Sequence, residues 1–334
     1  MARKALLIGV DNYPGKWALP SCVNDCDKLA NILANNINPD GKSESPNFDV
    51  IKLTDCRSAE EAEQAIRDVF EFVGQDVSLF YFSGHGYVDA NNNGQILFPK
   101  NMKSGNTVKG LLMKDIMDIV TLSKVNNKIV ILDCCHSGKI SNDNIHSNMA
   151  TLPDGCTILS ACHPKQTAKA SIFNSEFTYL LIQALSGEAA DYLGNITVGG
   201  VYSYIDKSMG WYGQRPIFKT NITSFIPLRI VKPAIELATM QEGLLLFGGA
   251  DESIKLDPSY EYTTYEDQEE ALKSNPKVKA FKTLQKLESI GFVVPVDEEH
   301  MYWAAMKKKS CRLTKIGQYY WKLENDRRLK KWKK

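Results

Sequence analysis

Short apolar runs that alternate with helical segments constrain the fold of this 334-residue chain more than any other feature. Most of these runs are predominantly apolar, which is typical of a strand buried on both faces of a parallel sheet. The runs occupy residues 4–10, 48–54, 77–83, 128–134 and 156–162. Segments with apolar residues at helical spacing occupy residues 22–36, 58–73, 113–122, 175–187 and 199–209. This alternation predicts an α/β fold, in which a mostly parallel sheet carries helices on both faces.

Two elements carry signals at their ends. Ser58 stands before a helical segment whose first turn is acidic, so we expect it to cap that helix. Residues 215–219 predict one more short strand, and Pro216 within it has no N–H to donate to a neighbour. We therefore expect this strand to lie at an edge of the sheet.

The last third of the chain does not continue the alternation of apolar runs and helical segments. We therefore predict that the chain has three parts. These are an α/β domain over residues 1–228, a connecting segment over 229–270, and a small α+β domain with a basic tail over 271–334. The connecting segment contains a mixed stretch and then an acidic one, without a clear period.

The small C-terminal domain has its own succession of elements. Residues 276–296 predict an amphipathic helix that ends at Gly291, followed by a short strand. Residues 300–329 predict a second strand, a basic turn and a helix capped by Thr314. This order resembles a winged helix-turn-helix.

Charge and composition limit the partners and the location. The net charge of +1 argues against nucleic-acid binding by the chain as a whole. Residues 306–334 are the exception, because they hold twelve Lys or Arg against two acids. The first residues lack a signal-peptide cleavage site, and no apolar stretch approaches the roughly 20 residues that span a bilayer. With eight cysteines as well, we expect free thiols, no membrane contact and a cytoplasmic location.

Reactive side chains follow two of the predicted strands. Ser83-Gly84-His85-Gly86 ends the run at 77–83, and Asp133-Cys134-Cys135-His136 ends the run at 128–134. The carboxyl ends of parallel strands meet at one edge of a sheet, and neighbouring strands lie about 4.8 Å apart. His85 and a cysteine are then expected to face each other. An imidazole activates a thiol as a nucleophile, and backbone N–H groups beside glycine can hold an oxyanion.

These motifs resemble those of the caspase and metacaspase clan of cysteine peptidases. The letters SGHG and D-x-C-H-S-G match the metacaspase signatures, and residue 135 follows residue 85 by the 50 positions typical of caspases. Residues 19–29, 158–164 and 177–187 are also similar to family segments. The likeness covers about residues 3–225 and implies a caspase-like fold, as in bacterial caspase-like proteases.

The resemblance implies a role for each motif residue. Cys135 aligns with the nucleophile and His85 with its base, and the N–H groups of Gly86 and Cys135 would form the oxyanion hole. Cys134 occupies a variable position, where we expect a small buried apolar side chain. His136 is expected to be structural.

The resemblance also implies the specificity. Metacaspases use acids at positions that match Asp25 and Asp133, with a serine that matches Ser83. Two carboxylates in one pocket repel each other, so they favour a cationic guest that neutralises both. We therefore expect cleavage after Arg or Lys, with Arg better suited to a paired interaction. The alternative is that Asp25 is a solvated residue of its helix.

The sequence offers two candidate metal sites, for calcium and for zinc, and favours neither. Asp89, Asn91, Asn93 and Gly94 match the opening of an EF-hand loop, and several metacaspases need calcium. The twelfth position of that loop is Lys100 instead of an acid, and turn chemistry explains the Asn-Gly run more simply. A zinc site is disfavoured because no paired C-x-x-C units exist. We expect neither a metal nor a cofactor.

Two classes of function remain open. The first is a regulated effector peptidase, activated by cleavage or by a partner, with Lys139 in the loop 139–155 as the candidate for self-cleavage. The second is a catalytically silent regulator that binds protein or nucleic acid through its C-terminal domain. The presence of both His85 and Cys135 favours the first. For the C-terminal domain we favour a regulatory protein partner over DNA or RNA contact.

Overall fold

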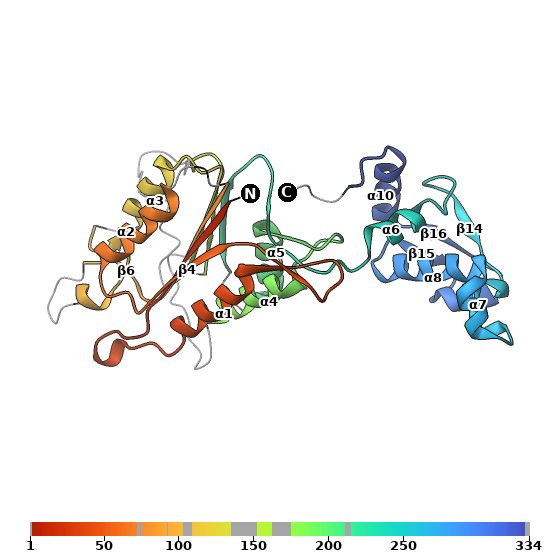
Figure 1. The fold of residues 1–334 in the computed structure, drawn as a ribbon, viewed down its shortest axis with the longest axis horizontal. Helices are drawn as coiled ribbons and strands as arrows, with labels where there is room; N and C mark the ends of the chain where they lie inside the picture. Colours follow the sequence, from red (N-terminus) through yellow and green to blue (C-terminus); the bar gives the residue numbers. More distant parts are fainter. Residues whose placement is uncertain are drawn as a thin grey trace. The chain divides into compact units, whose positions relative to one another are not determined.

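The computed structural model describes residues 2–71, 74, 76–91, 93–102, 109–134, 152–161, 175–210 and 215–330. The chain divides into two compact units, which we call unit 1 (Met1–Lys232) and unit 2 (Pro233–Lys334) (Figure 1). Within the described part of the chain, no helix combines the length and the apolar character needed to cross a membrane.

Unit 1 is built on a six-stranded sheet with the order β12-β10-β9-β5-β1-β4. Its strands are β1 (Arg3–Gly9), β4 (Asp49–Thr54), β5 (Val77–Ser83), β9 (Asn127–Asp133), β10 (Cys156–Ser160) and β12 (Ile217–Asn221). Neighbouring strands are parallel, except that β12 runs antiparallel to β10 at the edge. The five predicted parallel strands and the predicted edge strand are confirmed.

Helices cover both faces of this sheet, as the alternation predicts (Figure 1). They are α1 (Cys22–Ala34), α2 (Ala59–Phe70), α3 (Met113–Leu122), α4 (Glu176–Gln183) and α5 (Val198–Met209). Phe80 and Phe82 of β5 point into the core shared with α2 and α3, whereas Tyr81 between them belongs to the core under α1, α4 and α5. Ser58 accepts a hydrogen bond from the Glu61 backbone N–H, which confirms the predicted cap.

Gly9 at the end of β1 explains how α1 reaches the sheet. A Cβ atom at this position would lie 2.4 Å from the Cys22 carbonyl oxygen and 2.7 Å from the Cys26 sulfur. Glycine therefore permits a close approach that no other residue allows. The approach brings the first turn of α1, and with it Asp25, over the carboxyl ends of the central strands.

Short strands at the periphery of unit 1 have no counterpart in the sequence prediction. They are β2 (Asn35–Ile37), β3 (Glu44–Pro46), β6 (Gly86–Val88), β7 (Gly94–Ile96), β8 (Leu111–Leu112), β11 (Asn195–Thr197) and β13 (Pro227–Ile230). Each is too short to show an alternating pattern, so its pairing depends on its neighbours. In the small sheet β6-β7-β8, strand β6 begins directly after His85.

Unit 2 is a small α+β unit with its own core. Its elements are α6 (Leu237–Leu244), β14 (Ser253–Lys255), α7 (Gln268–Ser274), α8 (Pro276–Ser289), β15 (Val293–Val296), α9 (Met301–Met306), β16 (Ser310–Leu313) and α10 (Lys315–Asn325). The three strands form an antiparallel sheet with the order β14-β16-β15. Residues 229–270, which the sequence suggested as a connecting segment, contain α6 and β14.

One sequence prediction for unit 2 is wrong. The strand expected from residue 300 onward is the helix α9, and the strand β16 lies where a basic turn was expected. Met301, Ala304 and Ala305 are buried at helical spacing, and this burial outweighs the strand propensity of the aromatic residues between them. The helix α8, its end at Gly291 and the Thr314 cap are confirmed.

Candidate active site

The two strands that carry the reactive motifs are neighbours, as predicted. β5 pairs with β9 in parallel, and Ser83 lies opposite Asp133 at the ends of the two strands. The backbone N–H of Gly84 donates to the carbonyl oxygen of Asp133 at 3.3 Å. The turn that holds His85 is therefore tied to the chain that leads into Cys135.

His85 is oriented by a backbone carbonyl. Its Nε2 atom lies 2.7 Å from the carbonyl oxygen of Trp17, which ends the 3-10 turn Gly15–Trp17. Because a carbonyl only accepts, Nε2 must carry the proton, and Nδ1 of the neutral ring is left as the acceptor. The Tyr13 and Trp17 rings contact the imidazole edge-on, with centroids 4.6 and 5.7 Å away.

Tyr13 fixes the backbone of the histidine turn. Its hydroxyl accepts the His85 backbone N–H at 3.0 Å and donates to the Leu97 carbonyl at 3.0 Å. A Cβ atom on Gly84 would lie 2.5 Å from this hydroxyl, so glycine is required there. Burial raises the pKa of Tyr13 well above its ordinary value and keeps the hydroxyl protonated. Sequence reasoning missed Tyr13 and Trp17, whose only signal was their position after the first strand.

We expect Tyr13→Phe to lower kcat for a peptide substrate by about 10- to 100-fold, because two buried backbone groups lose their partner and the imidazole is less well held. Tyr87→Phe is the matched control, since Tyr87 lies two residues beyond His85 and is exposed. Steady-state kinetics of both variants test this. Equal kcat values for the two variants would show that the Tyr13 hydroxyl has no positioning role.

Two carboxylates lie at the same edge of the sheet. Asp25 on α1 is 0 % exposed, and neither of its oxygens has a well-formed hydrogen bond to any described residue. Asp133 is 5 % exposed, and its Oδ2 accepts hydrogen bonds from Ser175 and from Thr178, the latter at 2.6 Å. The Asp133 carboxylate is therefore stabilised by hydrogen bonds from two side-chain hydroxyls, whereas the Asp25 carboxylate has no such donors among the described residues.

The pKa values of the two groups reflect this difference. Burial, together with the nearby charge of Asp133, raises the pKa of Asp25 to about 7, against smaller opposing effects of the Ser175 backbone N–H and of Lys28. Burial also raises the pKa of Asp133, and the Ser175 and Thr178 hydroxyls oppose that rise. A buried carboxylate without a partner is costly, and a cation placed between the two would relieve the cost.

The remaining motif residues are placed as follows. Ser83 is buried and its hydroxyl interacts with the Cys22 thiol, whose pKa burial raises far above its ordinary value. Gly86 opens β6 and is half-buried beside His85. Cys134 is 2 % exposed and belongs to the core under α2 and α3, as expected of a structural side chain. Cys135, His136 and Lys139 lie outside the described residues.

Comparison with known proteins agrees with this architecture. A family model described as the caspase domain matches residues 2–223. The chain belongs to the caspase-domain family. Membership implies the fold of a cysteine peptidase.

One curated protein and one solved structure are similar to this chain. Metacaspase-1 of Candida glabrata is 28% identical over 155 residues, and the match covers 41% of this chain and 37% of that protein. The chain therefore spans well under half the length of this curated relative. A crystal structure of protein GSU0716 from Geobacter sulfurreducens superposes with a TM-score of 0.50 at 17% identity, over 69% of this chain and 100% of that one. This likeness concerns the fold alone.

In this caspase domain, the loop that resembles an EF-hand is a hairpin turn between β6 and β7. The Asp89 carboxylate accepts the backbone N–H groups of Asn91 and Asn93 at 2.9 and 2.8 Å, and also contacts the Gln95 side chain. The Asn93 backbone hydrogen bond lowers the pKa of Asp89. Over the described ranges, no three His, Cys, Asp or Glu side chains are grouped as a metal site.

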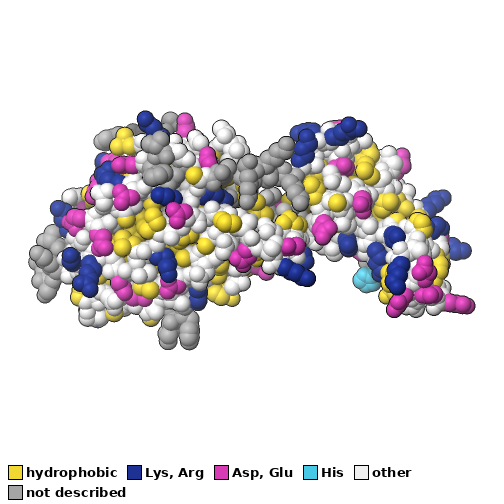
Figure 2. Space-filling model, in the orientation of Figure 1, with side chains coloured by type: hydrophobic (Ala, Val, Ile, Leu, Met, Phe, Trp, Pro, Cys, Tyr) yellow, Lys and Arg dark blue, Asp and Glu magenta, His cyan; other side chains and the backbone are white. Residues whose placement is uncertain are grey.

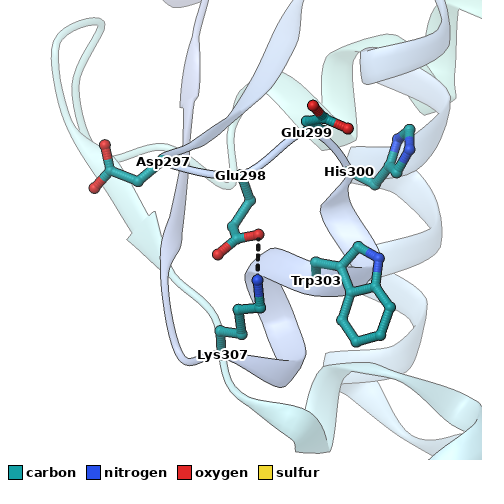
Figure 3. Close-up of a pocket in the computed structure, with 6 residues that line it drawn as sticks. All are labelled: Asp297, Glu298, Glu299, His300, Trp303 and Lys307. Atoms are coloured by element: carbon teal, nitrogen blue, oxygen red, sulfur yellow. Dashed lines mark hydrogen bonds and ion pairs between the residues drawn. The ribbon is translucent and has the colours of Figure 1, made fainter.

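Unit 2 contains a surface hollow of about 610 Å³, which Asp297, Glu298, Glu299, His300, Trp303 and Lys307 line. The Glu298 carboxylate points toward the Lys307 ammonium at 2.9 Å, while His300 and Trp303 form the opposite side (Figure 3). None of the caspase-domain site residues lies here. On the face shown in Figure 2, basic and acidic side chains are interspersed over unit 1 without a large area of one sign.

Proposed function

We propose that this chain is a cysteine endopeptidase that cleaves after Arg or Lys. The single observation that carries the specificity is the fully buried carboxylate of Asp25, which lacks a well-formed hydrogen bond to the described residues and lies near that of Asp133. Both lie at the sheet edge that also bears His85. A guanidinium or ammonium group is the ligand that such a pair of carboxylates fits, and Ser83 adds a hydroxyl to the same edge.

The proposed reaction follows from the orientation of His85. Nδ1 of His85 accepts the proton of the Cys135 thiol, and the thiolate attacks the backbone carbonyl carbon of the bound Arg or Lys. The N–H groups of Gly86 and Cys135 hold the developing oxyanion. The C–N bond then breaks, His85 returns its proton to the leaving amine, and water hydrolyses the thioester to free the carboxyl product.

A panel of fluorogenic peptides tests this function. We expect peptides that end in Arg or Lys to be cleaved at least about 100-fold faster than matched peptides that end in citrulline or Asp, because only a cation relieves the buried charge. The turn that Asp89 forms leads us to expect the same rates with calcium and with a chelator. Preferential cleavage after Asp, or no cleavage of any peptide under either condition, would contradict the proposal.

Regulation by self-cleavage at Lys139 belongs to this proposal. Lys139 follows the nucleophile motif directly in sequence and suits the proposed specificity. Intact masses of the wild-type protein and of Cys135→Ala separate cleavage by the chain itself from cleavage by another protease.

For unit 2 we propose a winged-helix-like module that recruits a regulatory protein partner. The order α6-β14-α7-α8-β15-α9-β16-α10 and the sheet order β14-β16-β15 support the comparison, with α9 in the connection between the last two strands. The chain is proposed to act in the cytoplasm. The alternative of a silent regulator predicts that the wild-type chain turns over none of the fluorogenic peptides, so the peptide panel distinguishes the two.

A further inference from the structure

Asp133 lies at the end of a directed chain of hydroxyl groups. The Tyr81 hydroxyl lies 2.7 Å from Thr178 Oγ1, and Thr178 Oγ1 lies 2.6 Å from Asp133 Oδ2. Thr178 has a single hydroxyl proton, and an ionised carboxylate only accepts. Thr178 therefore donates to Asp133, and Tyr81 must donate to Thr178.

Ser175 adds a second donor to the same oxygen. Its hydroxyl donates to Asp133 Oδ2 and, as the cap of α4, accepts the Thr178 backbone N–H at 3.0 Å. Both hydroxyls thus converge on Oδ2, and Oδ1 is the oxygen that neither of them occupies. Asp25, the second carboxylate of the proposed substrate pocket, receives no well-formed hydrogen bond from the described residues.

We propose that the hydroxyl groups of Thr178 and Ser175 determine which of the two pocket carboxylates carries the negative charge, and thereby set how tightly the pocket holds a cationic side chain near neutral pH. The inference rests on the proposed function and assigns it two specificity-determining positioning residues. Asp133 is the charged anchor and Asp25 is the group that ionises when the cation enters.

The neighbouring titratable groups leave this assignment to the two carboxylates. Four other titratable groups act electrostatically on the two carboxylates or are acted on by them. They are Cys22 and Lys28 of α1, Tyr81 of β5, and Asp11 in the loop between β1 and α1. Burial raises the pKa values of Cys22 and Tyr81 well above their ordinary values, so both stay neutral from pH 5 to 9. Asp25 and Asp133 are the two carboxylates whose ionisation the hydroxyls of Thr178 and Ser175 can change, and the neutral citrulline peptide controls for titration of other groups at this edge, His85 included.

Binding of an uncleaved peptide tests the inference without using the chemical step. The probe is acetyl-Ala-Ala-Arg-coumarin amide, and its citrulline counterpart is the neutral control. Each is titrated calorimetrically into the full-length Cys135→Ala protein between pH 5 and 9. Thr178→Val removes the donor with little change of shape, and Thr178→Ser restores it.

We expect Thr178→Val to weaken binding of the Arg peptide about tenfold at pH 7 and less than about threefold at pH 9, because loss of a donor moves the ionisation of Asp133 upward. Thr178→Ser should follow the wild-type curve, and citrulline binding should stay within about twofold in both variants. Ser175→Ala removes the other donor, and Ser175 is only half-buried. This variant should shift the pH dependence of Arg-peptide affinity in the same direction, and it keeps the test available if Thr178→Val folds poorly.

Two results would overturn the inference and are distinct from each other. In the first, the affinity for the Arg peptide depends on pH in Thr178→Val and Ser175→Ala in the same way as in the wild type. This result would show that the hydroxyls have a purely structural role, and it would leave the proposed peptidase specificity intact. A wild-type pocket that binds Arg and citrulline peptides equally would overturn the proposed specificity, and the inference with it.

Discussion

Replacement of Asp25 by Asn is expected to lower kcat/KM for Arg peptides by about 10²- to 10³-fold and, at the same time, to make the protein more stable at pH 8. The loss follows because one of two buried charges that would hold the substrate cation disappears. The gain follows because the wild-type carboxylate is fully buried, without a well-formed hydrogen bond to the described residues. Asn has nearly the same shape and no charge to desolvate.

The sign of the pH dependence follows from the raised pKa of Asp25, about 7 against an ordinary value of 3.8. The folded protein binds more protons at Asp25 than the unfolded chain between these two values. Stability is therefore lost as the pH rises from about 4 to 7 and stays reduced above that. We expect Asp25→Asn to exceed the wild type by about 2 to 4 kcal/mol in free energy of unfolding at pH 8, and by much less at pH 4.

Urea unfolding at pH 4, 6 and 8, with Arg-peptide kinetics on the same samples, measures both effects. Asp27→Asn is the control, because Asp27 lies on the same helix, is exposed and pairs with Lys52 at the surface. It should change stability by less than about 1 kcal/mol and leave kcat/KM unchanged. Lower stability of Asp25→Asn at pH 8 would mean that Asp25 has a partner in solution, and retained Arg turnover would mean that it lies outside the pocket.

The sheet of unit 1 could be predicted because each central strand is buried on both faces and is therefore apolar at most of its positions. Residues 77–83 and 127–133 show this most clearly, since nearly every side chain in them is buried. Because the carboxyl ends of parallel strands meet at one edge, the polar residues that follow these strands are also predicted to lie together. The pairing of Ser83 with Asp133 confirms that part of the prediction.

The groups that tune the site could not be predicted, because tertiary packing brings them there from distant segments. Thr178 is 45 residues from Asp133 in sequence, and Tyr13 is 72 residues from His85. A Thr within an amphipathic helix and a Tyr in a loop carry no signal of their own. Their roles depend on the close approach that Gly9 permits and on the turn that Gly84 allows, which only the folded chain reveals.

We expect Cys135→Ala and His85→Ala each to reduce kcat/KM for the Arg peptide by at least about 10³-fold, because each removes one member of a pair that acts as a unit. Cys134→Ala is the matched control for the adjacent sulfur. Cys134 is buried in the core under α2 and α3, so its loss should lower the free energy of unfolding by about 1 kcal/mol and leave turnover nearly intact.

An arginyl chloromethyl ketone distinguishes the two cysteines by a second route. The reagent should alkylate wild-type protein and Cys134→Ala at one site that peptide mapping places at residue 135, and it should leave Cys135→Ala unmodified. His85→Ala should react far more slowly, because without the imidazole the thiol remains protonated. Labelling of residue 134 in Cys135→Ala, or full activity of that variant, would show that the Cys135 sulfur is not the nucleophile.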